Sequence, residues 1–214
     1  MNRIKGIILG APGSGKGTIS DRIIHNFNIK HISSGDILRS NISNKTELGK
    51  TVSCYVAAGK LVPDEIMNRL IQNEMKNHIE SWLLDGYPRT ITQAVKLVEN
   101  VEINLVINLI VPFNIIIDRL KNRWIHEPSG RIYNIGFNNP KVPGLDDITQ
   151  EKLVQREDDK PSVVQERLKT YSSTVKPIIE FFKSKDILET FEGKSSDEIW
   201  GKLYPFLCKY IEKK

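Results

Sequence analysis

The chain has 214 residues and is 39% hydrophobic and 27% charged, a globular composition long enough for one domain with its own core. Its net charge is +5 and its pI is near 9.1. The basic residues are spread along the chain rather than gathered in one block, which favours a pocket for an anionic ligand over a broad basic surface. No apolar run reaches the roughly 18 residues of a membrane-spanning helix, and we expect no membrane partner.

The cysteines and the start of the chain bear on where the protein works. Cys54 and Cys208 lie far apart and form no metal-binding or redox motif, which predicts a reducing compartment. The first apolar run begins at residue 4, so close to Met1 that we expect neither a secretory nor a transit peptide before it.

The first half of the chain predicts strands that alternate with helices. Residues 4–9 are an apolar run of strand type, and the glycine-rich residues 10–18 follow. Ile19, Ile23 and Ile24 then share one face of a helix that extends to about residue 28. Further along we predict a strand over 29–32, helix-capping residues at 33–36, helical segments up to residue 56, and a helix that starts at residues 63–65.

The second half continues the alternation. Strands are predicted over 82–84, 105–111 and 187–191, with helices over about 92–98, 115–124 and around 199–203. The run 105–111 is nearly all apolar, as expected of a central parallel strand that is buried on both faces. Together the five strands predict a three-layer α/β fold, in which helices cover both faces of a five-stranded parallel sheet.

Residues 126–147 interrupt this pattern between two helices. They are rich in proline and glycine, and residues 131–135 alternate like a short strand. A long insertion of this kind in an α/β domain often covers the ligand. We therefore expect a small β lid here, the alternative being a surface loop without a role.

Gly10, Gly15 and Lys16 have the spacing of a phosphate-binding P-loop, and they stand between a strand and a helix. The backbone N–H groups of such a loop surround a phosphate, and the helix N-terminus and Lys16 add positive charge. The general pattern has Ser or Thr directly after the lysine, whereas here Gly17 intervenes and Thr18 carries the hydroxyl. The chain is therefore predicted to bind a polyphosphate.

Charged and polar residues also follow the other strands. Ligands of parallel α/β sheets bind at the carboxyl ends of the strands, so we expect these residues to converge near Lys16. They are Ser34, Asp36 and Arg39 after the second strand, Asp85 and Arg89 after the third, Arg119 and Arg123 on one face of the helix after the fourth, and Arg156 and Arg167 beyond the insertion. So many guanidinium groups in one crevice would repel one another without a polyanion.

Asp85 ends an apolar strand, where a carboxylate is costly unless it is paired or hydrated. Beside a P-loop its natural partner is Mg²⁺, which keeps several waters and takes few protein ligands. The alternative is an aspartate that only caps the strand end. The four histidines form no metal-binding pair and no Ser-His-Asp set. A phosphate acceptor explains this, because it is already anionic at neutral pH and needs positioning rather than a base.

Three segments together resemble the adenylate kinase family. Residues 10–18, with glycine between lysine and threonine, are similar to the family's P-loop. Residues 33–39 resemble its AMP-phosphate segment, and residues 84–90 with Gln93 resemble its signature stretch. The likeness covers nearly the whole chain in order. It implies a nucleoside monophosphate kinase with one P-loop domain: a core (1–32, 63–123, 161–214), an AMP-binding helical flap (33–62) and the lid (124–160).

The resemblance also implies the roles of single residues. The donor triphosphate would contact Gly13, Gly15, Lys16, Gly17, Thr18, Arg119, Arg123, Tyr133, Asn134 and Ser196. AMP would contact Ser34, Arg39, the backbone of Lys60, Leu61 and Val62, and then Gly86, Arg89, Gln93, Arg156 and Arg167. Catalysis would rest on Lys16, Asp85, Arg89, Arg123, Arg156 and Arg167, with Mg²⁺ held mainly by nucleotide phosphates and water.

Some members of the family hold the lid together with zinc on cysteines. The matching positions here are His126, Ser129, Asp146 and Thr149. Their side chains are expected to form a hydrogen-bonded cluster, so we expect no structural zinc and no metal held by the protein alone.

The donor base is expected to be guanine. Residues 123–126, 129–134 and 155–161 resemble the GTP:AMP phosphotransferase branch of the family, which uses GTP or ITP, typically in the mitochondrial matrix. An ATP:AMP kinase and a cytoplasmic location are the alternatives. Asn134 stands where ATP-using relatives often have a histidine that packs on adenine. Ser196 would either lie near the donor base or only cap the last helix.

Two other protein classes fit the sequence less well. A regulatory GTPase needs an Asn-Lys-x-Asp motif that reads guanine, and the sequence has none. A nucleic-acid-binding module needs clustered charge with interleaved aromatic residues, whereas aromatic residues are 7% of the chain and scattered. We expect a monomer whose partners are AMP and GTP or ATP.

Overall fold

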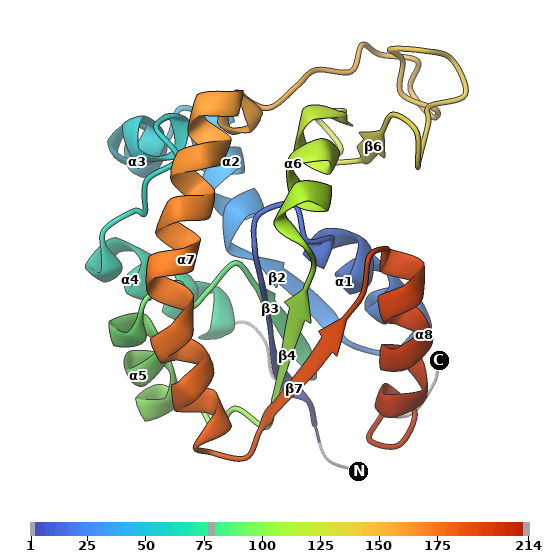
Figure 1. The fold of residues 1–214 in the computed structure, drawn as a ribbon. Coiled ribbons are helices and arrows are strands. Elements are labelled where there is room, and N and C mark those ends of the chain that lie inside the picture. Colours follow the sequence, from blue (N-terminus) through green and yellow to red (C-terminus); the bar gives the residue numbers. More distant parts are fainter. Residues whose placement is uncertain (1–2, 77–79, 212–214) are drawn as a thin grey trace.

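A parallel sheet forms the centre of the protein (Figure 1). The computed structural model describes residues 3–76 and 80–211, so the ends of the predicted core and its residues 77–79 lie outside the described residues. Within the described ranges the strand order is β2–β3–β1–β4–β7, and every pairing is parallel. The strands are β1 (Lys5–Gly10), β2 (Lys30–Ser33), β3 (Trp82–Asp85), β4 (Leu105–Ile110) and β7 (Leu188–Glu192). The predicted five-stranded parallel sheet is confirmed.

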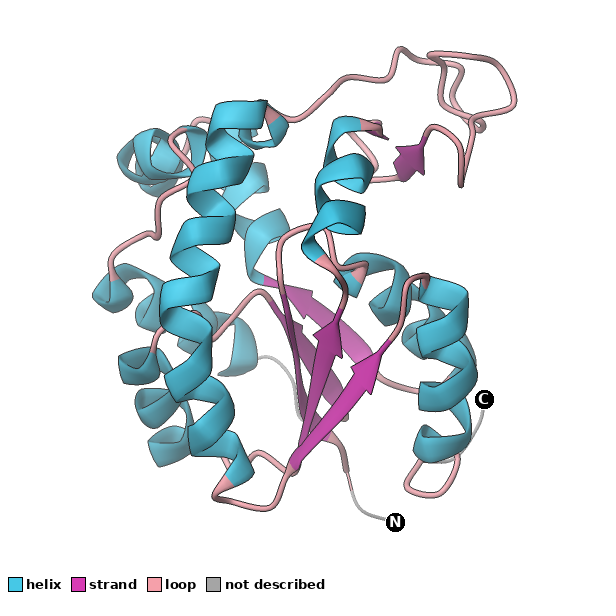
Figure 2. Cartoon of the chain, viewed as in Figure 1, coloured by secondary structure: helices cyan, strands magenta, loops and turns pink. Residues whose placement is uncertain are grey.

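Helices cover both faces of the sheet, as Figure 2 shows. They are α1 (Lys16–Asn26), α4 (Asp64–Lys76), α5 (Ile91–Asn100), α6 (Phe113–Lys121), α7 (Pro161–Lys183) and α8 (Ser196–Leu207). Ile8 of β1 belongs to a core with residues of α1, α6 and α8, whereas Ile7 and Leu9 belong to a core with α4, α5 and the second half of α7. Because side chains alternate along a strand, an apolar run builds both cores at once.

Two further helices pack against each other beside the sheet, within the predicted flap. They are α2 (Ser34–Ser43) and α3 (Glu47–Ala57), which lie in the helical stretch that the sequence predicts. The side chain of Ser33 accepts a hydrogen bond from Asp36 N at 3.2 Å, and that of Thr46 accepts one from Gly49 N at 3.0 Å. These N-caps satisfy backbone groups that would otherwise have no partner, which sets where the two helices begin.

The predicted helix over residues 115–124 is wrong at its end. Helix α6 stops at Lys121, and Arg123–Ile125 form strand β5 of the lid, which pairs antiparallel with β6 (Ile132–Asn134). Arg119 and Arg123 therefore do not share a helix face. Trp124 lies opposite Tyr133 in this pairing. The helical spacing of the apolar residues had extended the helix too far, because it does not register a pairing with a later segment.

The chain returns from the lid to the core through α7, whose bounds the sequence had not indicated. Pro161 is its first residue, where a missing N–H costs nothing. Its two halves contribute to different cores: Val164 and Leu168 to the α1 side of the sheet, and Ile178 and Phe182 to the α4 side. No helix of residues 3–76 and 80–211 is both long enough and apolar enough to cross a membrane.

The crossing of α2 and α3 predicts an effect of substituting Gly49. A Cβ at this position would stand 2.1 Å from the backbone oxygen of Asn41, so Gly49→Ala should force the two helices apart. We expect a loss of about 1–3 kcal/mol in the free energy of unfolding, as for other overpacked sites. Thermal unfolding measures this loss.

Gly201→Ala in α8 is the matched control, because nothing lies within 4 Å of the Cβ that it adds. A glycine-to-alanine change inside a helix should stabilise the protein by about 0.5–1 kcal/mol. Equal unfolding midpoints for the two variants would contradict the packing argument.

Candidate active site

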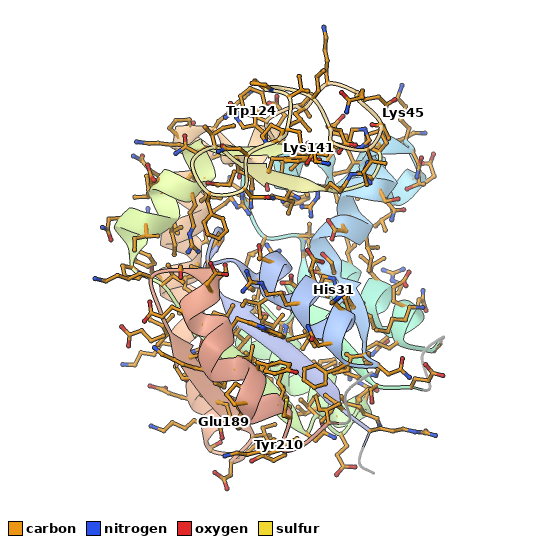
Figure 3. The ribbon with its side chains drawn as sticks, turned by 90° about the vertical axis from the view of Figure 1, so that its right-hand side faces the viewer. His31, Lys45, Trp124, Lys141, Glu189 and Tyr210 are labelled. Carbon is orange, nitrogen blue, oxygen red and sulfur yellow. The ribbon has the colours of Figure 1, made fainter. Side chains whose placement is uncertain are left out.

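A cleft of about 1310 Å³ opens at the carboxyl ends of the strands, between the core and the lid. In Figure 3, His31 lies on the core side of this cleft, and Trp124 and Lys141 lie in the lid above it. The lining comes from the P-loop and α1, the ends of β2 and β3, α2 and α3, α6, the lid, the segment that leads into α7, and the loop and first residue of α8. This is the edge of the sheet where parallel α/β proteins bind ligands.

The P-loop is folded around its own lysine. Lys16 Nζ donates hydrogen bonds to the backbone oxygens of Gly10 at 2.8 Å and Ala11 at 3.0 Å. Burial lowers the pKa of Lys16 to about 8, and the charges of nearby arginines add to this while Asp85 opposes it. Gly15 has a φ of 90°, and a Cβ there would stand 2.8 Å from Ser196 Oγ, so only glycine fits. The loop is thus already folded, and the positive charge of its lysine has only neutral carbonyl oxygens as hydrogen-bond partners.

The structure brings the predicted arginines together, although they come from distant parts of the chain. The cleft is lined by Arg39, Arg89, Arg119, Arg123, Arg156 and Arg167, together with Lys16 and Asp85. Gly13, Gly15, Gly17 and Thr18 of the P-loop line it as well. Such a density of guanidinium groups fits a ligand with several phosphates.

Two aspartates that sequence reasoning missed hold some of these arginines. Asp159 accepts hydrogen bonds from Arg123 at 2.7 and 2.5 Å, and its Oδ1 lies 3.3 Å from Arg167 Nη1. Arg167 Nη1 also lies 3.0 Å from Asp158 Oδ2. Both acids sit in the short 3₁₀ helix Glu157–Asp159, directly before α7. The acidic run after Arg156 was the signal in the sequence, but its partners could not be assigned.

Other polar atoms of the cleft have no hydrogen-bond partner within the described chain. They include Arg119 Nη1, Arg156 Nε and His31 Nε2, and the hydroxyl of Ser34, fully buried beside Gly86, has no partner either. Burial, together with the charges of Arg39 and Arg123, lowers the pKa of Arg156 to about 9. Buried donors without an acceptor are costly, so these groups indicate that an anionic ligand completes the site.

Asp85 faces the cleft from the last position of β3, beside Ser33 of β2 and Ile8 of β1. Its Oδ2 lies 3.6 Å from Nε2 of His31, which was not among the predicted site residues. Burial by itself lowers the pKa of His31, but Asp85, with Asp21 and Asp36, outweighs burial and raises it. At 3.6 Å the two side chains make no hydrogen bond, so within the described residues these carboxylates act on His31 through their charge.

A narrower pocket of about 60 Å³ adjoins the cleft under the flap. It gathers most of the residues predicted to contact AMP, namely Arg39, Lys60, Leu61, Val62, Gly86, Arg89 and Gln93, with Arg167 at its edge. The hydroxyl of Ser34 lies directly behind Gly86, 2.6 Å from where a Cβ of that residue would be. Leu38, Val56 and Met67 add apolar walls that sequence reasoning had not assigned.

The other end of the cleft lies under the lid and receives Asn134 and Ser196. Asn134 Nδ2 already donates to the backbone oxygen of Arg119 at 2.7 Å. The side chain that caps α8 belongs to Ser195, which accepts from Glu198 N at 3.0 Å, so the alternative that Ser196 is the cap is wrong. Phe137 and Lys194 also line this end, and sequence reasoning missed both.

Tyr133, which was predicted to contact the donor nucleotide, does not line the cleft. Its hydroxyl donates to Asp146 Oδ1 at 2.9 Å and accepts from Asp147 N at the same distance, inside the lid. Only 4% of its surface is exposed, so this side chain supports the lid. The neighbouring Ile132 and Asn134 face the cleft instead, because side chains alternate along β6.

The four lid positions form the hydrogen-bonded cluster that was predicted. His126 Nδ1 lies 2.7 Å from Ser129 Oγ, and Thr149 Oγ1 lies 3.2 Å from His126 Nε2 and 3.1 Å from Asp146 Oδ2. Arg131 adds two hydrogen bonds to Asp146, of 2.8 and 2.6 Å, and its guanidinium holds the pKa of that carboxyl far below its usual range. The side chains of this part of the lid are therefore satisfied by one another.

A P-loop beneath converging arginines, at the edge of a parallel sheet, defines the class of P-loop phosphotransferases. The chain belongs to the adenylate kinase family, whose model matches residues 8–187.

Curated relatives agree with this assignment. The chain is 53% identical over 206 residues to a protein of Drosophila melanogaster named GTP:AMP phosphotransferase, mitochondrial, a match that covers 95% of this chain and 94% of the relative. It is 44% identical over 208 residues to a Saccharomyces cerevisiae protein of the same name, covering 92% and 89%. It is also 43% identical over 184 residues to an adenylate kinase of Baumannia cicadellinicola, covering 85% and 86%.

The lid cluster predicts stability without metal. Treatment with a chelator should leave the thermal midpoint unchanged, and metal analysis should find no stoichiometric zinc, because the paired hydroxyls are poor zinc ligands. Asp146→Asn should instead lower the midpoint, since Arg131 and Tyr133 lose a charged partner at a cost of about 1–3 kcal/mol. One zinc per chain, with loss of stability on its removal, would contradict this account of the lid.

Proposed function

We propose that the protein reversibly transfers the γ-phosphoryl group of GTP, or ITP, to AMP, which yields the nucleoside diphosphate and ADP. The observation that carries the proposal is the convergence of Lys16 and the cleft arginines between a pocket under the flap and a second end under the lid. Two relatives that match over most of their length carry the name GTP:AMP phosphotransferase, which supports this donor and this acceptor.

AMP is the acceptor in the pocket under the flap. Its phosphate would be held by Arg39, Arg89, Arg156 and Arg167, and Gln93 would meet its base. Arginine suits this task because a planar fork of N–H groups matches two phosphate oxygens. Ser34 and the backbone of residues 60–62 would line the nucleoside.

The donor triphosphate lies along the P-loop in this proposal. The N–H groups of residues 13–18 and the N-terminus of α1 would surround its phosphates. Lys16 would leave the carbonyl oxygens that it now contacts and follow the migrating group. Arg119 and Asn134 would flank the base, with Ser196 behind it.

The chemistry needs no general base. An AMP phosphate oxygen attacks the γ-phosphorus, while the bond from that phosphorus to the bridging oxygen of the diphosphate breaks and the diphosphate leaves. The nucleophile is already anionic at pH 7, because the second pKa of a phosphomonoester is about 6. The protein therefore contributes alignment and charge, which is what most phosphoryl transferases supply.

The lid and the flap are proposed to move toward the core, with divisions near residues 33–62 and 124–160. Asp158 and Asp159 now neutralise Arg123 and Arg167, and phosphates would take over part of these contacts. Closure would remove the water that would otherwise hydrolyse the donor.

Members of this family typically work with Mg²⁺, and the residues present fit that ion. Asp85 and Thr18 offer oxygen donors on the wall of the cleft beside Lys16, and Mg²⁺ prefers oxygen. Asp85, directly or through water, would help to hold the ion on the nucleotide phosphates. When bound, Mg²⁺ neutralises phosphate charge and fixes the triphosphate in place.

An ATP:AMP kinase is the second candidate. It is favoured by the 43% identity to a protein named adenylate kinase, and by Phe137, an exposed aromatic ring on the cleft wall that offers a stacking surface. The amide of Asn134, with both donor and acceptor capacity, favours guanine instead. We also propose a mitochondrial location, in the matrix, and a monomeric state; the names of two relatives include the word mitochondrial.

Lys16→Met tests the P-loop. The charge of the lysine is used on the migrating phosphoryl group, so we expect kcat to fall by about 10²-fold or more. Lys183→Met, an exposed lysine in the last turn of α7, is the control and should keep normal turnover. A Lys16→Met enzyme with near-normal kcat and a normal thermal midpoint would remove Lys16 from the mechanism.

The choice of donor is tested by kcat/KM for GTP and for ATP, at fixed AMP and Mg²⁺. We expect GTP to be preferred by about tenfold or more, since a site built on hydrogen bonds rejects the base that leaves its polar groups unpaired. A preference for ATP of the same size would identify an ATP:AMP kinase. No turnover of AMP with either donor would contradict the proposed function itself.

A further inference from the structure

We propose that Asp64 is a positioning residue that fixes the orientation of the Gln93 amide and thereby selects adenine over bases with the opposite hydrogen-bond pattern. The proposal rests on the proposed function, which places the acceptor base against Gln93. Asp64 is the first residue of α4 and is not among the residues that line the pocket. Gln93 lines the pocket and is 2% exposed.

The Gln93 side chain is bound at both ends. Its Oε1 accepts a hydrogen bond from the backbone N–H of Arg89 at 2.7 Å, and its Nε2 donates to Asp64 Oδ1 at 2.7 Å. A carboxylate can only accept and a backbone N–H can only donate, so these partners decide which end of the amide is oxygen and which is nitrogen. If the amide turned by 180°, its NH₂ group would face the N–H donor of Arg89 and its oxygen would face the carboxylate of Asp64.

Asp64 is itself held in place. Its Oδ2 accepts from Thr90 Oγ1 at 2.9 Å, and the same hydroxyl accepts from Gln93 N at 3.1 Å as the N-cap of α5. The carboxylate therefore joins the start of α4 to the start of α5. An acid in the first turn of a helix is common because it meets the helix dipole. Here its two oxygens have specific partners as well, and one of them is the residue that faces the pocket.

The lock leaves Gln93 with one N–H and one oxygen lone pair for a ligand. Adenine presents an amino donor beside the N1 acceptor, and hypoxanthine presents the reverse, an O6 acceptor beside an N1–H donor. An amide that can turn freely serves both patterns, whereas an amide held in one orientation suits one of them. By fixing the orientation of the Gln93 amide, Asp64 thus allows this side chain to distinguish adenine from hypoxanthine.

The test compares AMP with IMP as acceptors, because the two bases have nearly the same shape and opposite patterns. Asp64→Asn keeps the size of the side chain but can offer either a donor or an acceptor to Gln93. We expect the KM for AMP to rise about tenfold, with kcat and the donor KM changed less than about twofold, and the AMP/IMP ratio of kcat/KM to fall about tenfold. Asp64→Ala, which removes the acceptor, should shift the ratio in the same direction.

Glu65→Gln is the matched control. It removes one negative charge from the same first turn of α4, but Glu65 is exposed, and within residues 3–76 and 80–211 no hydrogen bond or ion pair joins it to Gln93. We expect its acceptor kinetics to equal those of the wild type. Thermal unfolding of every variant separates a loss of folding from a change in selectivity.

The outcomes are distinct. An active wild type, with an AMP/IMP ratio that neither Asp64 variant changes, overturns the inference and leaves the proposed function intact. A loss of kcat for AMP and IMP alike at an unchanged ratio also overturns it, since that is the effect of a merely structural residue. A wild type that does not phosphorylate AMP contradicts the proposed function, and the inference falls with it.

Discussion

The concentration of positive charge at one edge of the sheet is the constraint on which the rest of the structure depends. Arg39, Arg89, Arg119, Arg123, Arg156 and Arg167 share a cleft with Lys16. Burial, with a smaller contribution from the charges of nearby arginines, lowers the pKa of Lys16 to about 8 and that of Arg156 to about 9. Asp158 and Asp159 compensate part of this charge in the ligand-free protein. The positive charge that these aspartates do not neutralise is unfavourable in the ligand-free protein. Because the phosphates of a bound nucleotide would neutralise it, this preorganised charge favours polyanionic ligands.

Polar networks with definite partners position the groups that surround this charge. In the lid, His126, Ser129, Asp146 and Thr149 bind one another, and Arg131 and Tyr133 complete the shell of Asp146. Under the flap, Asp64 and Thr90 hold Gln93. In both places a carboxylate accepts from several donors, so breaking one contact leaves another group unpaired.

Much of the site could be predicted because its signals are local. The P-loop needs glycine where φ is positive and lysine at a fixed spacing, and both appear in one stretch of the chain. The ends of the strands could be predicted equally well, since apolar runs buried on both faces stop abruptly at polar residues. The end of α6 was not, because pairing of Trp124 with Tyr133 competes with helical spacing and lies outside any local window. The roles of His31, Asp64 and Asp159 could not be predicted for the same reason. The local sequence around an acid or a histidine is the same whether or not a residue far along the chain becomes its partner.

The sequence by itself determined the class of fold, the phosphate-binding loop and the set of arginines that a polyphosphate requires. Local propensity and hydrophobic period carry that information, because they depend on residues a few positions apart. Only the tertiary structure decided which arginine pairs with which aspartate, that Tyr133 supports the lid while Asn134 faces the cleft, and that Ser195 rather than Ser196 caps α8. Hydrogen bonds and ion pairs depend on distances of a few ångströms between segments far apart in the chain, and those distances exist only once the sheet has brought its strand ends together.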